Sequence, residues 1–163
     1  MEIIIQQFEQ SILKSLNLSL SNLEKDLECE EYFGYNLNIN QSFIKFRKAK
    51  ITPKKVGQFV TLWKRNQTNQ TQPFDEKDPF DYYIVATEDA SRLGFYIFSK
   101  AILIEKQILS THNKEGKRGF RVYPNWTKPE NKQALKTQNW QQAYFIEIVN
   151  NQFDRSKLFT IFK

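Results

Sequence analysis

The sequence predicts an α/β or α+β domain, in which a central mixed sheet is flanked by helices, from three observations. Apolar residues near the N-terminus recur at helical spacing, whereas later stretches alternate between apolar and polar positions. The chain has 163 residues, of which 40% are hydrophobic and 15% aromatic, enough to fill one compact core. It has only five Gly and five Pro, no internal repeat and no long linker, so residues 1–163 are predicted to form a single domain.

The first thirty residues are predicted to be helical. Isoleucine, leucine and phenylalanine residues at helical spacing predict an amphipathic helix over residues 2–16. Ser21 is followed three residues later by Glu24, a pattern typical of the cap of a second, short helix.

A hairpin and a third helix are expected next. Between Tyr32 and Lys48 the apolar residues lie on both sides of Asn40-Gln41, which predicts a β-hairpin. Thr52-Pro53 is typical of a helix start, and apolar residues at positions i, i+3, i+4 and i+7 predict a helix over residues 53–64.

The remainder of the chain is predicted to form short strands and two more helical segments after a polar loop at residues 66–80. In chain order we expect strands at 81–87 and 93–98, a short helix capped by Ser99 and ending at Glu105, short strands at 108–109 and 119–122, and a helical stretch that begins at Pro129, with Ala134, Trp140, Tyr144 and Phe145 facing inward.

Composition argues against an exported or membrane-spanning protein. Glu2 stands where a signal peptide carries positive charge, and no stretch approaches the ~20 apolar residues of a membrane span. Cys29 has no partner for an internal disulfide, and together with the single His112 it cannot form a zinc site. We therefore expect a cytoplasmic protein with no membrane contact and no small-molecule cofactor.

Positive charge is concentrated in two blocks of a chain whose net charge is +6. Residues 45–65 contain eight bases and no acid, and residues 114–140 contain seven bases and two acids. If both blocks meet on one face, they concentrate positive potential, for which nucleic acid is the usual partner. The alternative is two solvated faces that point apart.

The first block contains five candidate phosphate contacts. Alternation along a strand places Arg47 on one face and Lys48 and Lys50 on the other. Lys54 and Lys55 flank the N-terminus of the helix expected directly afterwards, where free backbone N–H groups attract phosphate. The alternative is a basic, solvated corner between a strand and a helix.

The second block contains three more candidates, Lys117, Arg118 and Arg121, which surround Gly116 and Gly119. The glycines allow close approach of a backbone, and an arginine can grip phosphate with two N–H groups. The alternative is a tight basic hairpin turn.

A third segment of candidates lies on the last predicted helix. Lys132 and Lys136 are four residues apart and share one helix face, whereas Gln133 and Gln141 share another that could reach bases. Trp140 is a candidate for stacking on a base, although a tryptophan at such a position is more often part of a core.

No catalytic residue is assigned. The single His112 lies in a polar stretch typical of a surface loop, and no motif pairs it with a nucleophile. Asp75, Asp78 and Asp81 precede a predicted strand and could bind a divalent ion, with a solvated acidic loop as the alternative. We therefore predict binding rather than catalysis.

Long strings of the sequence resemble the MepB family. They are Phe46-Arg47-Lys48-Ala49-Lys50 and its continuation to Arg65, Gly116-Lys117-Arg118-Gly119-Phe120-Arg121-Val122-Tyr123-Pro124, and residues 133–141. The resemblance covers about residues 30–148. The family takes its name from a protein encoded beside a bacterial multidrug efflux pump. The resemblance implies a fold related to the nuclease-like PD-(D/E)XK core, and binding of DNA or RNA.

Two other functions stay open under this resemblance. A metal-dependent nuclease of the PD-(D/E)XK type would use Asp81 to hold Mg²⁺, but the next predicted strand, residues 94–100, contains no second acid. The other alternative is a protein-interaction accessory of a multidrug-efflux operon.

Overall fold

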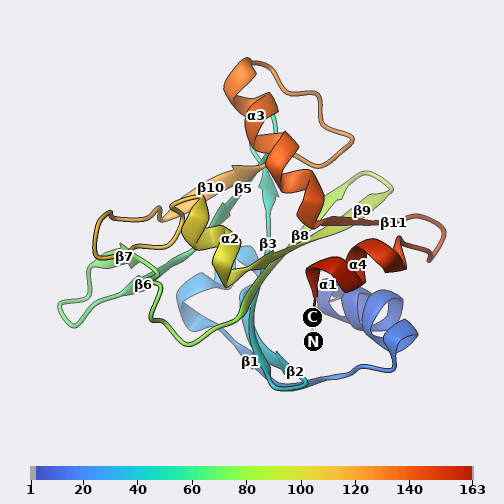
Figure 1. Cartoon of the computed structure of the whole chain (residues 1–163), viewed down its shortest axis with the longest axis horizontal. Coiled ribbons are helices and arrows are strands. Elements are labelled where there is room, and N and C mark those ends of the chain that lie inside the picture. The colour runs from blue at the N-terminus through green and yellow to red at the C-terminus, as the bar shows by residue number, and fades with distance from the viewer. Residues whose placement is uncertain (1–2, 163) are drawn as a thin grey trace.

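The computed structural model describes residues 3–162, which contain a central six-stranded mixed sheet (Figure 1). Strands β3 and β8 run parallel, and every other neighbouring pair is antiparallel. The mixed sheet with flanking helices is confirmed. In spatial order the strands are β1 (Leu20–Lys25), β2 (Tyr35–Ile39), β3 (Ser42–Lys48), β8 (Tyr82–Asp89), β9 (Arg92–Ser99) and β11 (Phe145–Ile148).

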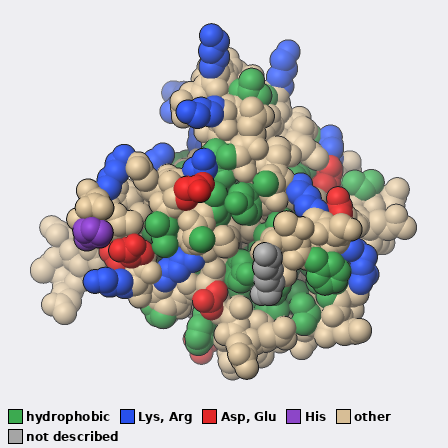
Figure 2. All heavy atoms as spheres, viewed as in Figure 1, with side chains coloured by type: hydrophobic (Ala, Val, Ile, Leu, Met, Phe, Trp, Pro, Cys, Tyr) green, Lys and Arg blue, Asp and Glu red, His purple; other side chains and the backbone are tan. Residues whose placement is uncertain are grey.

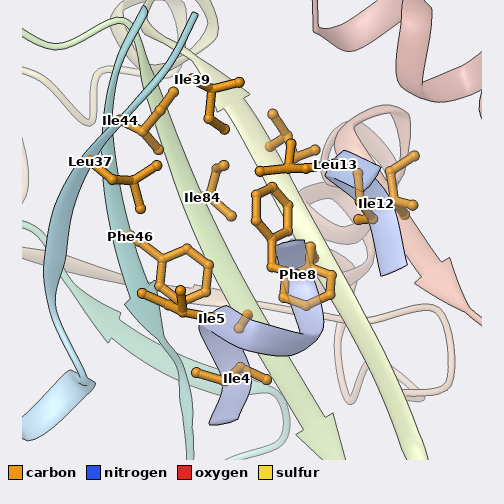
Figure 3. Close-up of a cluster of buried hydrophobic side chains, with 14 of the residues drawn as sticks. Ile4, Ile5, Phe8, Ile12, Leu13, Leu37, Ile39, Ile44, Phe46 and Ile84 are labelled. Carbon is orange, nitrogen blue, oxygen red and sulfur yellow. The ribbon is translucent and has the colours of Figure 1, made fainter. Parts of the chain in front are cut away.

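Helical segments cover one face of this sheet. The helix α1 (Ile3–Phe8) continues through a π-helical turn, η1 (Glu9–Leu13), and a 3₁₀ turn, η2 (Lys14–Leu16). Together with α4 (Arg155–Ile161) it packs on apolar residues of the central strands, as Figure 3 shows for the first helix. The predicted N-terminal helix is confirmed over residues 3–16, and its first residue lies outside the described residues.

A smaller sheet and two helices cover the other face. The smaller sheet has the order β10-β5-β4, and its apolar residues pack on Tyr83, Val85, Tyr96 and Phe98 of the central sheet. Its strands are β10 (Gly119–Val122), β5 (Gln58–Thr61) and β4 (Lys50–Ile51), and the helices are α2 (Lys100–Glu105) and α3 (Lys132–Gln141). As predicted, Ser99 caps α2, because its hydroxyl accepts the N–H of Ile102 at 3.3 Å.

The helix predicted over residues 53–64 is wrong. Residues 53–57 form bends, and the chain then forms β5 and the hairpin of β6 (Trp63–Arg65) with β7 (Thr71–Pro73). The observed burial has period two, since Val60 and Leu62 are fully buried while Phe59 and Thr61 are half-buried. Gly57 has φ +87°, which a helix does not allow. The helical spacing of the apolar residues was therefore coincidental, and pairing with β10 determines this segment.

Three further expectations differ from the structure. The short helix predicted at Ser21 is strand β1, because this segment pairs with β2, and a 3₁₀ segment, η3 (Leu27–Tyr32), follows it. The strand predicted at residues 108–109 is a buried, irregular segment that follows the turn at the end of α2. The last predicted helix begins at Lys132 rather than Pro129, continues as η4 (Gln142–Tyr144), and leads directly into β11.

The predicted hairpin is confirmed as β2 and β3 with Asn40 at its turn, and the two predicted strands after the polar loop are confirmed as β8 and β9. Among residues 3–162, no helix has the length and apolar character that a membrane crossing requires.

Candidate functional site

A groove of about 580 Å³ lies between β10 and α3, and residues 105–108 at the end of α2 also line it. In Figure 1, α3 rises above the small sheet, and Figure 2 shows Lys and Arg side chains around this helix and hydrophobic side chains between α3 and α2. The structure therefore brings together the second and third candidate segments. Six residues selected from the sequence line the groove: Lys117, Arg121, Gln133, Lys136, Trp140 and Gln141.

Helix α3 is attached to the strand beside it by glutamine side chains. Gln141 is fully buried; its Nε2 donates to the carbonyl of Arg121 at 2.9 Å, and its Oε1 accepts the N–H of Tyr123 at 3.0 Å. Gln138 Nε2 donates to the carbonyl of Pro124 at 3.0 Å. Gln141 was expected to contact bases, but its amide is already bonded to β10. It acts instead as the anchor of the groove wall.

The edge of β10 that faces the groove is partly open. β10 is an edge strand, and the carbonyl of Arg118 accepts the N–H of Leu62 at 2.9 Å on the side of β5. Because backbone groups in an antiparallel pair point alternately toward and away from the partner strand, those of Gly119 and Arg121 point toward α3. Of these groups, Gln141 binds the carbonyl of Arg121, and no other hydrogen bond within residues 3–162 engages the remaining ones, which leaves them to a ligand.

Lysine side chains surround the groove. Lys117 and Lys136 are exposed, and in the described part of the chain neither ammonium has a hydrogen-bond or ion-pair partner. Lys106 lies 5.4 Å from the centre of the Trp140 ring and 3.8 Å from the carboxylate of Glu105. Lys106 was not among the residues predicted from the sequence, because the packing of α2 against the sheet places this turn beside α3.

Trp140 is mainly a packing residue. Its ring lies 5.6 Å from that of Phe98 and 6.3 Å from that of Tyr144, and Lys106 approaches it from the groove. A base could stack on this ring only after displacing the lysine. The structure therefore favours the core interpretation of Trp140 over the stacking one.

The guanidinium of Arg121 is bonded to the loop over residues 52–57. It donates to oxygen atoms that all belong to this loop: Nε to Val56 O at 3.0 Å, and Nη2 to Thr52 Oγ1 at 2.6 Å, Gly57 O at 3.1 Å and Lys55 O at 3.2 Å. The middle of the first basic block thus adjoins the second one. Lys54 and Lys55 are exposed on this loop.

Arg47 is not accessible. It is fully buried, and its Nη2 donates to a carboxylate oxygen of Asp26 at 2.5 Å while its Nη1 donates to the carbonyl of Phe46 at 2.8 Å. Burial alone would raise the pKa of Asp26, but the charges of Arg47 and Lys45 outweigh it and lower that pKa below its ordinary value. The expected phosphate contact is therefore a buried structural ion pair.

The other candidates of the basic blocks have local partners. Lys48 lies 2.8 Å from the carboxylate of Glu88, and Lys50 lies 4.7 Å from the centre of the Tyr32 ring. Arg118 is exposed, donates to the carbonyl of Thr71 at 3.0 Å, and lies 3.3 Å from the carboxylate of Glu115. Lys48 and Arg118 are thus partly neutralised where they stand.

A second groove, of about 520 Å³, lies between the β1–β3 part of the sheet and residues 74–80. Lys45 lines it, donates to Asn36 Oδ1 at 3.0 Å, and lies 4.7 Å from the centre of the Phe74 ring. Burial and the charge of Arg47 lower the pKa of Lys45 below its ordinary value, against the opposing effect of Asp26. Glu24 and Asp78 also line this groove, so it does not present a purely positive surface.

The acidic residues near β8 are bonded to the protein. Asp81 accepts the N–H of Phe43 at 2.8 Å, and Asp78 lies 2.7 Å from the ammonium of Lys64 and accepts the N–H of Asp75 at 2.6 Å. Within residues 3–162, no group of three His, Cys, Asp or Glu residues is placed to hold a metal ion. Asp81 links the starts of β3 and β8.

The chain is similar to a known family and to two solved structures. The sequence matches the MepB-like family over residues 26–147. A solved structure named "Crystal Structure of MepB" has 31% sequence identity and a TM-score of 0.79, covering 90% of this chain and 97% of that one. A bacterial homing endonuclease, I-Ssp6803I, has 13% identity and a TM-score of 0.47, covering 85% of this chain and 87% of that one. No curated protein sequence matches the chain.

Proposed function

The chain belongs to the MepB-like family, and we propose that the groove between β10 and α3 binds DNA or RNA mainly through its phosphates. The set of lysines around the groove supports this function most directly. Lys117 and Lys136 are exposed and have no carboxylate partner among the described residues, and Lys106 faces the same groove. Positive charge left unpaired around a concave surface attracts a polyanion.

The groove residues divide into two roles. The ammonium groups of Lys106, Lys117 and Lys136 contact phosphates, which position the nucleic acid without reading its sequence. Gln133 on α3 and the open backbone groups of Gly119 on β10 line the groove and contact bases or sugars. No cofactor takes part in this proposal, and the protein acts in the cytoplasm, where nucleic acid is accessible.

The test is a fluorescence anisotropy titration with labelled 20-nucleotide DNA and RNA, between about 50 and 200 mM salt. The variant Lys117→Glu/Lys136→Glu reverses two groove charges. The matched control Lys14→Glu/Lys25→Glu makes the same change in net charge at two exposed lysines outside the groove.

We expect binding that weakens as salt is raised, with a slope of log K against log salt of about −0.7 for each phosphate contacted on a single strand. Reversal at Lys117 and Lys136 reduces the steepness of that slope by about 1.4, because two contacts are lost. The control variant keeps the slope of the wild type. No binding at the lowest salt, or equal losses in the two variants, would refute the proposal.

A further inference from the structure

We infer that Arg121 is a positioning residue, which holds the loop over residues 52–57 so that Lys54 and Lys55 extend the phosphate-binding surface of the groove. The inference rests on the proposed function, and it assigns to Arg121 a role other than the direct phosphate contact expected from the sequence. It also makes this loop a second part of the interaction surface.

The guanidinium of Arg121 is the main polar connection between the loop and the rest of the protein. Four hydrogen bonds of 2.6–3.2 Å join two of its nitrogens to the loop. Outside the strands, no backbone–backbone hydrogen bond in residues 3–162 involves residues 52–57. A planar guanidinium with fixed N–H directions can satisfy several carbonyls at once, which a lysine ammonium in its place cannot reproduce.

Packing fixes the other end of the loop. Gly57 has φ +87°, and a Cβ atom at this position would lie 2.7 Å from Cε1 of Tyr123. Tyr123 follows β10 directly and also lines the groove. The loop therefore lies so close to Tyr123 in the groove wall that any side chain at Gly57 would push the loop away from the wall.

The charges that this arrangement presents are those of Lys54 and Lys55. Both are exposed, and in the described residues neither ammonium has a hydrogen-bond or ion-pair partner. The acceptors of Arg121 are neutral carbonyl and hydroxyl oxygens, and in the part of the chain that the structure describes no carboxylate pairs with this guanidinium. A polyanion that lies in the groove meets the loop lysines beside Arg121 and Tyr123, which line the groove and adjoin the loop.

A double-mutant cycle distinguishes positioning from direct contact. The variants are Arg121→Lys, which keeps the charge but loses the fork of hydrogen bonds, Lys54→Ala/Lys55→Ala, and their combination. Gly57→Ala serves as a second perturbation, because it displaces the loop without altering any charged group. Each is titrated with the labelled single strand at 50 and 200 mM salt, and thermal melting checks that each is folded.

Between 50 and 200 mM salt, the fold decrease in affinity of Lys54→Ala/Lys55→Ala should be about sevenfold smaller than that of the wild type. This is the change expected when two phosphate contacts disappear. Arg121→Lys and Gly57→Ala should each reproduce much of this loss of salt dependence. Neither change should weaken binding further when Lys54 and Lys55 are already alanine.

The outcomes separate the inference from the proposal on which it rests. Suppose that the wild type binds and that Arg121→Lys binds as tightly as the wild type. Suppose instead that the loss of affinity in Arg121→Lys adds fully to the loss in Lys54→Ala/Lys55→Ala. In either case the positioning role is wrong and groove binding stands. If Arg121→Lys does not fold, the same comparison with Gly57→Ala decides. A wild type that binds nothing at 50 mM salt removes both the proposed function and this inference.

Discussion

Replacement of Gln141 by leucine tests whether one buried amide anchors the groove wall. The side chain is fully buried and joins α3 to β10 through a donated and an accepted hydrogen bond of 2.9 and 3.0 Å. Leucine has a similar size but can make neither bond. The carbonyl of Arg121 and the N–H of Tyr123 would then lose their partners beneath the helix.

The expected cost follows from those two backbone groups. A buried polar group that loses its partner costs about 1–3 kcal/mol, and part of this is regained by the apolar side chain, so we expect a loss of about 2–4 kcal/mol in the free energy of unfolding. For a domain of this size, each kcal/mol lowers Tm by about 2–4 °C, which corresponds to a decrease of about 5–15 °C.

The assay is urea-induced unfolding of the wild type, Gln141→Leu and the matched control Gln133→Leu. Gln133 lies on the same helix but is exposed, and among the described residues its amide has no hydrogen-bond partner. The control should therefore differ from the wild type by at most about 0.5 kcal/mol. A loss below about 1 kcal/mol for Gln141→Leu, or equal losses in both variants, would show that the amide does not anchor α3.

Four further predictions concern the ion pair of Arg47 and Asp26, the cap of α3 and the nuclease alternative. Arg47→Met should destabilise the protein by about 3 kcal/mol in urea unfolding, because among residues 3–162 it leaves Asp26 with Lys45 as its one ion-pair partner; an unchanged midpoint would contradict this. The pKa of Asp26 is lower in the folded protein than in the unfolded chain, so its carboxylate stabilises the fold at pH values above its unfolded-state pKa. This contribution disappears as the pH falls through the folded-state pKa. The difference in the free energy of unfolding between the wild type and Asp26→Asn should therefore shrink between pH 7 and pH 3 and not widen. Asn131→Ala removes the cap of α3 and should cost about 1 kcal/mol with a lower melting temperature, whereas no change would mean that the cap is unimportant. Plasmid DNA should remain intact with Mg²⁺ or Mn²⁺, and nicking that disappears in a folded Asp81→Ala variant would instead support the nuclease alternative.

Local sequence patterns predicted several of the helices and strands of the central sheet and of the N-terminal segment that packs on it. The helical spacing of residues 3–16 matches the structure, because one face of this segment packs on the central sheet. The strands predicted there are observed as β2, β3, β8 and β9, and β8 and β9 are apolar along their length because both of their faces are covered. The segment from Thr52 to Arg65 was misassigned, because its apolar residues satisfy a helical spacing as well as a strand alternation. Its pairing with β10, sixty residues further along the chain, decided between the two.

The same distinction applies to the candidate site. Clustering of basic residues along the chain indicated which segments carry positive charge, and six of the selected residues do line one groove. Neither the burial of Arg47 against Asp26 nor the orientation of Arg121 toward the loop could be predicted, because both depend on partners distant in the sequence. That Lys106 lines the groove could not be predicted for the same reason.

The amino-acid sequence by itself determined the family, the mixed α/β class and the positions of the basic residues, since these are properties of composition and local pattern. Only the tertiary structure decided which cations are free to meet a ligand. Whether a guanidinium contacts solvent, a carboxylate or a carbonyl depends on which segments the sheets and helices bring beside it, and that information is not local to any stretch of the chain.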